Sequence, residues 1–196
     1  METDCSEAGG VRASRLRAFA VGAVLVAVAL TGGVGWAQRR AAPVAPAEAP
    51  ASAVVAAPEE PGERLVVEGT VFGADGKTPV AGASVYAYHT DAAGSYGPGG
   101  NRDPRLRAYL RTDAQGRYRF ETIKPGAYPR GSVPAHIHFH VAPPDGGGER
   151  ITEVVFAGDP QVTERMRRSD DYAVLPLDRG ADGVLHCTYD LRLRVE

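Results

Sequence analysis

The stretch PAHIHFHV, residues 134–141, alternates histidine with apolar residues at every second position. In an extended strand successive side chains point to opposite faces, so His136, His138 and His140 share one face. The intervening apolar side chains share the other face and require a core behind the strand. Because two imidazoles on one strand can reach the same ion, the pattern indicates either a zinc, copper or iron site or a plain polar strand face.

The rest of the C-terminal two thirds of the chain consists of short β-like segments separated by turn residues. The expected strands are LVVEGTVFG (65–73), ASVYAYHT (83–90), RAYLRT (107–112), RYRFET (117–122), RITEVVF (150–156) and GVLHCTYDLRLRV (183–195). The turn DAQG should join 107–112 to 117–122 as a hairpin, and QVTERMRR (161–168) should form a short helix. Short strands without intervening helices predict an all-β sandwich or barrel.

The N-terminal part has a different composition. Three arginines in VRASRLR (11–17) precede Ala18–Ala37, twenty residues without a charge, so residues 1–37 are expected to be a signal peptide or a membrane anchor. The positive cluster before this segment predicts export, to the periplasm, the medium or the outer side of a membrane. Residues 38–62, rich in Ala and Pro, predict an extended linker, which leaves 63–196 as the folded domain.

Charge and cysteine content exclude two classes of protein. The formal net charge of −2 gives no electrostatic reason to expect a nucleic acid partner. The only two cysteines, Cys5 and Cys187, lie at opposite ends of the chain, so no disulfide framework is expected. Cys187 falls on the apolar face of the closing strand and is expected to be an inert core thiol, whereas His186 falls on the polar face.

Two tyrosines lie in loops where oxygen donors could complete a metal site. Tyr96 stands in DAAGSYG after the second expected strand, and Tyr128 stands in IKPGAYP directly before the histidine strand. The cupin barrels, which also use His-x-His, fit poorly. They need a glutamate soon after the histidines, whereas the next one here is Glu149, beyond a Gly-rich turn.

With these segments the domain resembles the intradiol ring-cleavage dioxygenases, the family of protocatechuate and catechol dioxygenases. The resemblance runs from VEGTVFGADGKTPVAGASVYAYHTDAAGSYG (67–97) through RTDAQGRYRFETIKPGAYP (111–129) and PAHIHFHV to ITEVVFAGDP (151–160). It implies a transthyretin-like (prealbumin-like) β-sandwich. It also implies cleavage of a catechol-type ring between its two hydroxylated carbons by O2, to give a muconate-type diacid.

The resemblance further implies a non-haem Fe(III) ion held by four residues, namely Tyr96, Tyr128, His136 and His138. Two anionic phenolate oxygens suit a ferric ion, whose charge stabilises phenolates that in free tyrosine form only near a pKa of about 10. Tyr128 is the expected axial ligand and the base that takes a proton from the substrate. The partners are a small aromatic diol and O2, and association into a homo-oligomer is compatible with the resemblance.

The chain also departs from the family pattern. Val133 stands three residues before His136, where the aromatic-degrading members usually have an arginine that faces substrate charge. Arg130 is the candidate to supply that charge from the loop. Glu153 stands where the family often has glutamine, and His140 has no counterpart among the four ligands.

Two other functions stay open from the sequence alone. The first is a non-catalytic binding module, because the segment from residue 67 also resembles transthyretin-like carrier domains. The second is a zinc or copper enzyme that uses His136, His138 and His140 and has no need of Tyr128.

Overall fold

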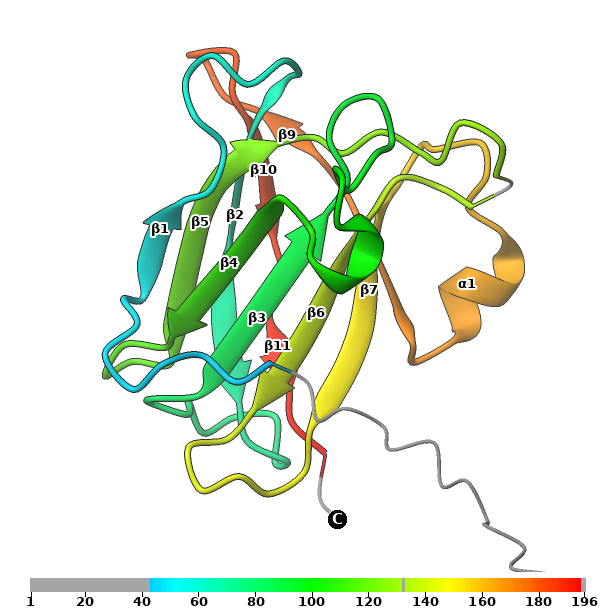
Figure 1. The fold of residues 1–196 in the computed structure, drawn as a ribbon. Helices are drawn as coiled ribbons and strands as arrows, with labels where there is room; N and C mark the ends of the chain where they lie inside the picture. The colour runs from blue at the N-terminus through cyan, green and yellow to red at the C-terminus, as the bar shows by residue number, and fades with distance from the viewer. Residues whose placement is uncertain (1–42, 132, 195–196) are drawn as a thin grey trace, which may run out of the picture. The chain divides into compact units, whose positions relative to one another are not determined.

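Residues 43–131 and 133–194 are described by the computed structural model, and almost all their regular structure is β (Figure 1). The expected signal or anchor segment, residues 1–37, lies outside this part of the chain. Within the described ranges, no helix is both long and apolar enough to cross a membrane. The strands are β1 (Ser52–Val54), β2 (Arg64–Phe72), β3 (Ser84–His89), β4 (Leu106–Arg111), β5 (Arg117–Ile123), β6 (His136–Ala142), β7 (Arg150–Phe156), β8 (Tyr172–Leu175), β9 (Asp178–Arg179), β10 (Leu185–Thr188) and β11 (Leu191–Arg192).

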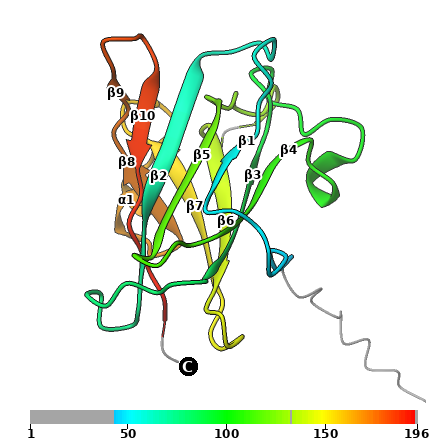
Figure 2. The same ribbon diagram turned by 90° about the vertical axis from the view of Figure 1, so that its left-hand side faces the viewer.

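The strands form two sheets that lie as layers over a shared core (Figures 1 and 2). One sheet has the order β1-β5-β2-β10-β9, with β11 also paired to β2, and the other has the order β4-β3-β6-β7-β8. A 3-10 turn, η1 (Gly100–Arg102), and one short helix, α1 (Glu164–Arg168), complete the regular structure of the described residues. This architecture confirms the all-β prediction.

The core between the sheets is built from the alternating apolar positions of the strands. On β6, the side chains of Ile137, Phe139 and Val141 are fully buried. Phe139 reaches across to the opposite sheet, where its ring centroid lies 6.1 Å from that of Tyr118 and 6.2 Å from that of Phe120. Since the inner face of β6 is committed to this core, its histidines must lie on the outer face of the second sheet.

The expected hairpin between residues 107–112 and 117–122 is wrong. β4 and β5 are consecutive and are joined by a turn at Asp113–Gly116, but they belong to different sheets. β4 pairs with β3, and β5 pairs with β2. In both strands apolar and polar side chains alternate, so β4 can pack its apolar face on the core from one sheet and β5 from the other. The turn between them then forms a corner that joins the two layers.

The described part of the expected linker differs from an extended spacer. β1 pairs in parallel with β5, and the side chains of Ala45 and Ala56 are buried. The amide of Ala45 donates to Ser84 Oγ at 2.7 Å, and Arg111 Nη2 donates to the Ala45 carbonyl at 2.8 Å. Small side chains can pack closely on a sheet, so an Ala/Pro-rich composition can cover a surface as well as span a gap.

The long closing strand is divided into β10 and β11, which both pair in parallel with β2. The division falls at Tyr189 and Asp190, where Asp190 Oδ1 accepts from the Thr70 amide at 2.8 Å. Cys187 on β10 is buried, and burial raises the pKa of its thiol to about 12. The expectation of an inert core thiol is therefore confirmed.

Candidate metal centre

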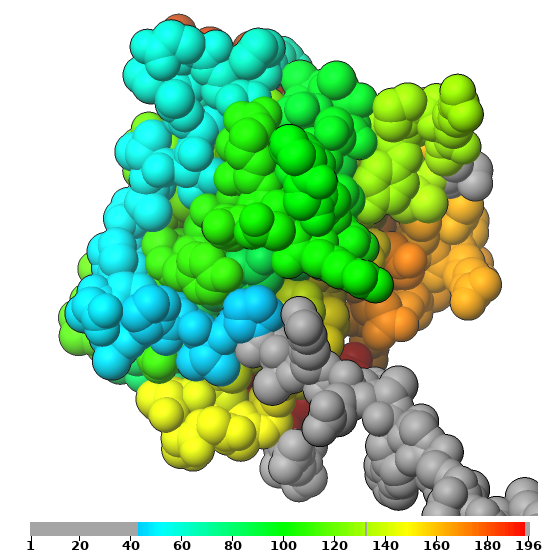
Figure 3. Space-filling model, viewed as in Figure 1, coloured from blue at the N-terminus to red at the C-terminus, as the bar shows by residue number. Residues whose placement is uncertain are grey.

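The four tyrosine and histidine residues named from the sequence meet on the outer face of the second sheet. His136 and His138 occupy outward positions of β6. Tyr96 comes from the loop between β3 and η1, and Tyr128 from the loop between β5 and β6. These two loops and α1 border the same side of the molecule, coloured green, yellow-green and orange in Figure 3.

The polar ends of these four side chains form a closed cluster. Tyr96 Oη lies 2.6 Å from Tyr128 Oη and 2.9 Å from His138 Nε2. His136 Nε2 lies 3.2 Å from Tyr128 Oη and 3.1 Å from His138 Nε2. Four donor atoms from three separate segments of chain therefore converge on one point.

The opposite nitrogen of each imidazole is already engaged. His136 Nδ1 donates to the Pro134 carbonyl at 2.8 Å, so its Nε2 is free of a proton while the ring is neutral. His138 Nδ1 lies 3.3 Å from the carboxylate of Glu153, an arrangement that favours the proton on Nδ1 there too. Both Nε2 atoms consequently turn lone pairs toward each other.

The proton count of this cluster favours a cation. Its four contacts, at 2.6–3.2 Å, each need one shared proton, but only the two tyrosine hydroxyls bring one when both rings are protonated on Nδ1. Two contacts, including the one between the imidazoles, are then lone pair against lone pair. A metal ion would replace the missing protons, and two phenolates with two imidazoles suit a hard, highly charged ion. The residues present fit a ferric ion.

Burial shifts the pKa values of two residues of the cluster, His136 and Tyr96. Desolvation lowers the pKa of His136, which keeps the ring neutral as a metal ligand must be. Desolvation also raises the pKa of Tyr96, and the hydrogen bond with Tyr128 adds to that effect. Without a cation, Tyr96 is therefore a neutral phenol at physiological pH, and metal binding must displace its proton.

The two tyrosine loops are fastened to each other beneath the cluster. Thr90 Oγ1 donates to the Gly126 carbonyl at 2.7 Å, and the Gly126 amide donates to the Asp91 carbonyl at 2.9 Å. The approach is so close that a Cβ on Gly126 would lie 2.4 Å from the Ala92 carbonyl oxygen. Glycine at this position lets the two backbones touch, which fixes the relative positions of the loops.

A buried histidine that the sequence reading did not single out supports both loops. His89, at the end of β3, is 1% exposed. Its Nδ1 donates to the Thr90 carbonyl at 2.7 Å, and its Nε2 lies 2.8 Å from Thr122 Oγ1 on β5. The one signal in the sequence was its place on the inward-facing side of the expected strand, and such a place indicates a core residue rather than a metal ligand.

The remaining residues considered from the sequence lie outside the cluster. Arg130 is exposed in the turn after Pro129, and no hydrogen bond or ion pair of its guanidinium is found among the described residues. Val133 is partly buried in the segment that leads into β6. His140 points to the same side as the other two histidines, but its Nδ1 lies 3.3 Å from Glu149, away from the cluster. His140 is thus separate from the four donors.

A second, overlapping set of donors is also present. One ligand atom each from His136, His138 and Glu153 can be chosen so that all lie within 4.8 Å of one another. Glu153, however, faces Nδ1 of His138, on the ring edge opposite the Nε2 that joins the tyrosines. The two sets therefore use different sides of the same imidazole.

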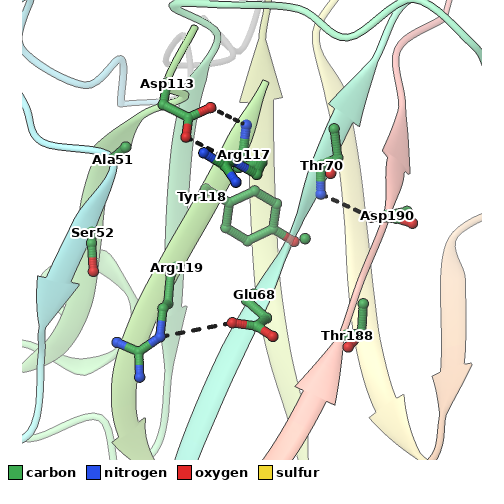
Figure 4. Close-up of a pocket in the computed structure, with 11 residues that line it drawn as sticks. Ala51, Ser52, Glu68, Thr70, Asp113, Arg117, Tyr118, Arg119, Thr188 and Asp190 are labelled. Carbon is green, nitrogen blue, oxygen red and sulfur yellow. Dashed lines mark hydrogen bonds and ion pairs between the residues drawn. The ribbon is translucent and has the colours of Figure 1, made fainter. Parts of the chain in front are cut away.

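A hollow of about 470 Å³ lies on the other sheet (Figure 4). Its charged groups are already paired with one another or with backbone: Arg117 with Asp113, Arg119 with Glu68, and Asp190 with the Thr70 amide. None of the four clustered residues lines this hollow. Because these charged groups already have partners within the protein, the donor cluster is the stronger candidate site.

Comparison with known proteins agrees with the fold. The family model described as "Dioxygenase" matches residues 41–195. Catechol 1,2-dioxygenase 2 of Acinetobacter lwoffii is 34% identical over 141 residues, which cover 63% of this chain and 50% of that protein. The protocatechuate 3,4-dioxygenase beta chain of Burkholderia cepacia is 42% identical over 111 residues, covering 50% of this chain and 47% of that one.

Solved structures give the same result. The dioxygenase domain of a dioxygenase–carbohydrate-binding fusion protein from Streptomyces sp. SirexAA-E has a TM-score of 0.59 and 26% identity, covering 79% of this chain and 95% of that chain. Catechol 1,2-dioxygenase from Acinetobacter sp. ADP1 has a TM-score of 0.58 and 26% identity, and the match covers 78% of this chain and 62% of that chain. The fold and the matches define the class: the chain has the all-β fold of the dioxygenases that it matches.

This chain belongs to the intradiol dioxygenase family. It spans about half the length of the two curated relatives described above.

Proposed function

We propose that this protein is a non-haem Fe(III) dioxygenase that cleaves a catechol-type ring between its two hydroxylated carbons with O2, giving a muconate-type diacid. The observation that carries the proposal is the convergence of four donor atoms that lack the protons to satisfy one another. Family membership supports it, because the relatives that the chain matches are named as catechol and protocatechuate dioxygenases.

In this proposal Tyr96, Tyr128, His136 and His138 hold the iron. When bound, a ferric ion supplies Lewis acidity toward the two hydroxyl groups of the substrate and the redox chemistry that O2 requires. The chain's own part is to hold the donors rigidly. Strand β6 fixes both histidines, and the two tyrosine loops, which are hydrogen-bonded to each other, fix both tyrosines.

Tyr128 is the proposed base. Its loop lies at the margin of the cluster, its side chain is partly exposed, and its Oη contacts Tyr96 and His136. A diol that enters from solvent meets this residue on the accessible side, so Tyr128 Oη is placed to take a proton from a substrate hydroxyl. Tyr96 also makes two contacts, with Tyr128 and His138, so the choice of Tyr128 rather than Tyr96 as the base rests on the family resemblance.

Arg130 is the proposed source of positive charge for the substrate. Val133 offers none at the position where the family usually has arginine, and Arg130 lies exposed in the Tyr128 loop. A guanidinium with no partner among the described residues can turn toward a charged oxygen of the bound substrate.

We also propose the finer features that the sequence suggests for the whole protein. The two-layer fold is classed as a transthyretin-like sandwich. The Arg-rich start and the apolar segment Ala18–Ala37 support export of the catalytic domain by a signal peptide or a membrane anchor. Association of several copies into a homo-oligomer completes the proposal.

The test is the metal and colour of the purified protein. We expect near-stoichiometric iron and a reddish tyrosinate-to-Fe(III) absorption that weakens strongly in Tyr96→Phe and Tyr128→Phe, together with oxygen uptake on a panel of catechols. His140→Ala is the matched control, because it lies on the same strand face but outside the cluster, and it should keep its iron and colour. A colourless protein that takes up zinc in preference to iron would refute the proposal and favour the set of His136, His138 and Glu153.

A further inference from the structure

Glu153 lies directly beside His138 in the sheet. The two residues are opposite each other in the antiparallel pair of β6 and β7, and Glu153 Oε1 lies 3.3 Å from His138 Nδ1. On the other side of His138 is its β3 neighbour Tyr88, whose ring stacks on the imidazole with centroids 4.4 Å apart and planes 16° apart. The imidazole is therefore held by a flat ring on one face and a carboxylate at one nitrogen.

The position of this carboxylate decides what it can do. Nδ1 and Nε2 stand on different edges of the ring, and Nε2 is the atom that lies 2.9 Å from Tyr96 Oη. A carboxylate at Nδ1 draws the ring proton to that nitrogen and leaves Nε2 as a bare lone pair aimed at the cluster. Histidine ligands of metals commonly have such a partner, and it also makes the ligand nitrogen more basic.

The charge of Glu153 adds to this effect. Glutamine, of nearly the same shape, would accept through its amide oxygen but would bring no negative charge. A carboxylate next to a ligand lends the site extra negative charge, and this favours a trivalent ion over a divalent one. His136 obtains its corresponding contact from the neutral Pro134 carbonyl. The Nδ1 atoms of the two histidines therefore face partners of different charge, a carboxylate at His138 and a neutral carbonyl at His136.

We propose that Glu153 is a positioning residue that fixes His138 as the Nδ1–H tautomer and biases the site toward ferric over ferrous iron. The second half of this statement rests on the proposed function, whereas the first half holds for the metal-free protein. Glu153 itself makes no contact with substrate in this proposal. It acts through the ring of His138.

The chain offers a matched control on the same sheet face. Glu149 Oε1 lies 3.3 Å from Nδ1 of His140, the same distance as that between Glu153 Oε1 and Nδ1 of His138. His140 stands two positions further along β6 and does not join the four donors. Glu149→Gln therefore removes an equivalent carboxylate without touching the proposed ligands.

The first measurement is the tautomer of His138 in the metal-free protein, read from imidazole ¹⁵N shifts at mildly alkaline pH. We expect the Nδ1–H form in the parent, in Glu153→Gln and in Glu149→Gln, and a mixture of tautomers in Glu153→Ala. An Nε2–H tautomer in the parent, or an unchanged tautomer in Glu153→Ala, would overturn the proposal. If Glu153→Ala folds poorly, the tautomer of the parent still tests the first half of the proposal, and Glu153→Gln, which keeps the side-chain shape, tests the second half in the iron measurement below.

The second measurement is iron affinity in both oxidation states. Loss of the partner of a ligand histidine commonly weakens metal binding by about 10–100-fold, and we expect a loss of that order for Fe(III) in Glu153→Ala. Glu153→Gln should lower the ratio of Fe(III) to Fe(II) affinity, while Glu149→Gln should leave it unchanged. Equal losses in Glu153→Gln and Glu149→Gln would show a general charge effect and refute the proposed bias. If the parent has the expected tautomer but binds no iron, the proposed function and the bias fail, and the tautomer role stands.

Discussion

Mild acid should destabilise this protein through His89, the buried histidine beneath the two tyrosine loops. Its imidazole is 1% exposed and is neutral in the folded protein, since it donates from Nδ1 to the Thr90 carbonyl and meets Thr122 Oγ1 with Nε2. Both ring nitrogens contact neutral oxygens, so protonation would bury a charge that no carboxylate of the described residues contacts by a hydrogen bond. Burial accordingly lowers the pKa of His89 from 6.5 to about 4.

The sign and size of the effect follow from proton binding. Between these two pKa values the unfolded chain binds more protons than the folded protein, so stability rises with pH in that window. The contribution of His89 is fully present above about pH 6.5 and is lost as the pH falls toward 4. The linkage relation gives a loss of about 2 kcal/mol at about pH 5 and about 3 kcal/mol at the acid limit.

Urea unfolding of the protein and of His89→Gln, each at about pH 7.5 and about pH 5, measures this loss. Other groups titrate alike in both proteins, so the difference between their pH dependences isolates His89. We expect the parent to lose about 2 kcal/mol more than the variant between the two pH values. An equal loss in both proteins would refute the reasoning, because it would mean that His89 is protonated in the fold without cost.

Three substitutions test other parts of the structure. Gly94→Ala should weaken iron binding, because a Cβ at this position, with φ of +79°, would lie 2.1 Å from the Ala127 carbonyl oxygen and push the tyrosine loops apart. Gly146→Ala, with φ of +80° and no atom within 4 Å of the added Cβ, is its control, and equal iron loss in both would contradict the explanation. Phe139→Ala should lower the free energy of unfolding by about 3–5 kcal/mol, measured in urea, since the ring is fully buried between the sheets; a loss below about 1 kcal/mol would show that the core collapses around the gap. Arg111→Ala should release residues 43–51, because the Arg111 side chain donates to the Ala45 and Pro46 carbonyls, and limited proteolysis should then cut there faster than in the parent. Cleavage at the parent rate would show that β1 alone holds this segment in place.

The sequence by itself determined the local pattern of this protein. Alternation in HIHFHV assigned Phe139 and its apolar neighbours to the core and the histidines to the opposite face, because successive side chains of any strand point to opposite sides. The same alternation placed Cys187 in the core. The four donors were named through the resemblance of their short motifs to those of a known family, which alternation alone does not supply.

Only the tertiary structure decided which segments meet. Alternation is the same whether β5 pairs with β4 or with β2, so the sequence could not show that the chain turns a corner between the sheets at Asp113–Gly116. The docking of the Ala/Pro-rich segment depends likewise on a surface built by distant strands.

The surroundings of the site were hidden for the same reason. Glu153 and Tyr88 flank His138 only because β7 and β3 pair with β6 in one particular register. His89 supports the loops of Tyr96 and Tyr128 only because β3 and β5, in different sheets, end close together. Each side chain's face is set by its immediate neighbours in the chain, whereas its partners are set by packing across the whole core.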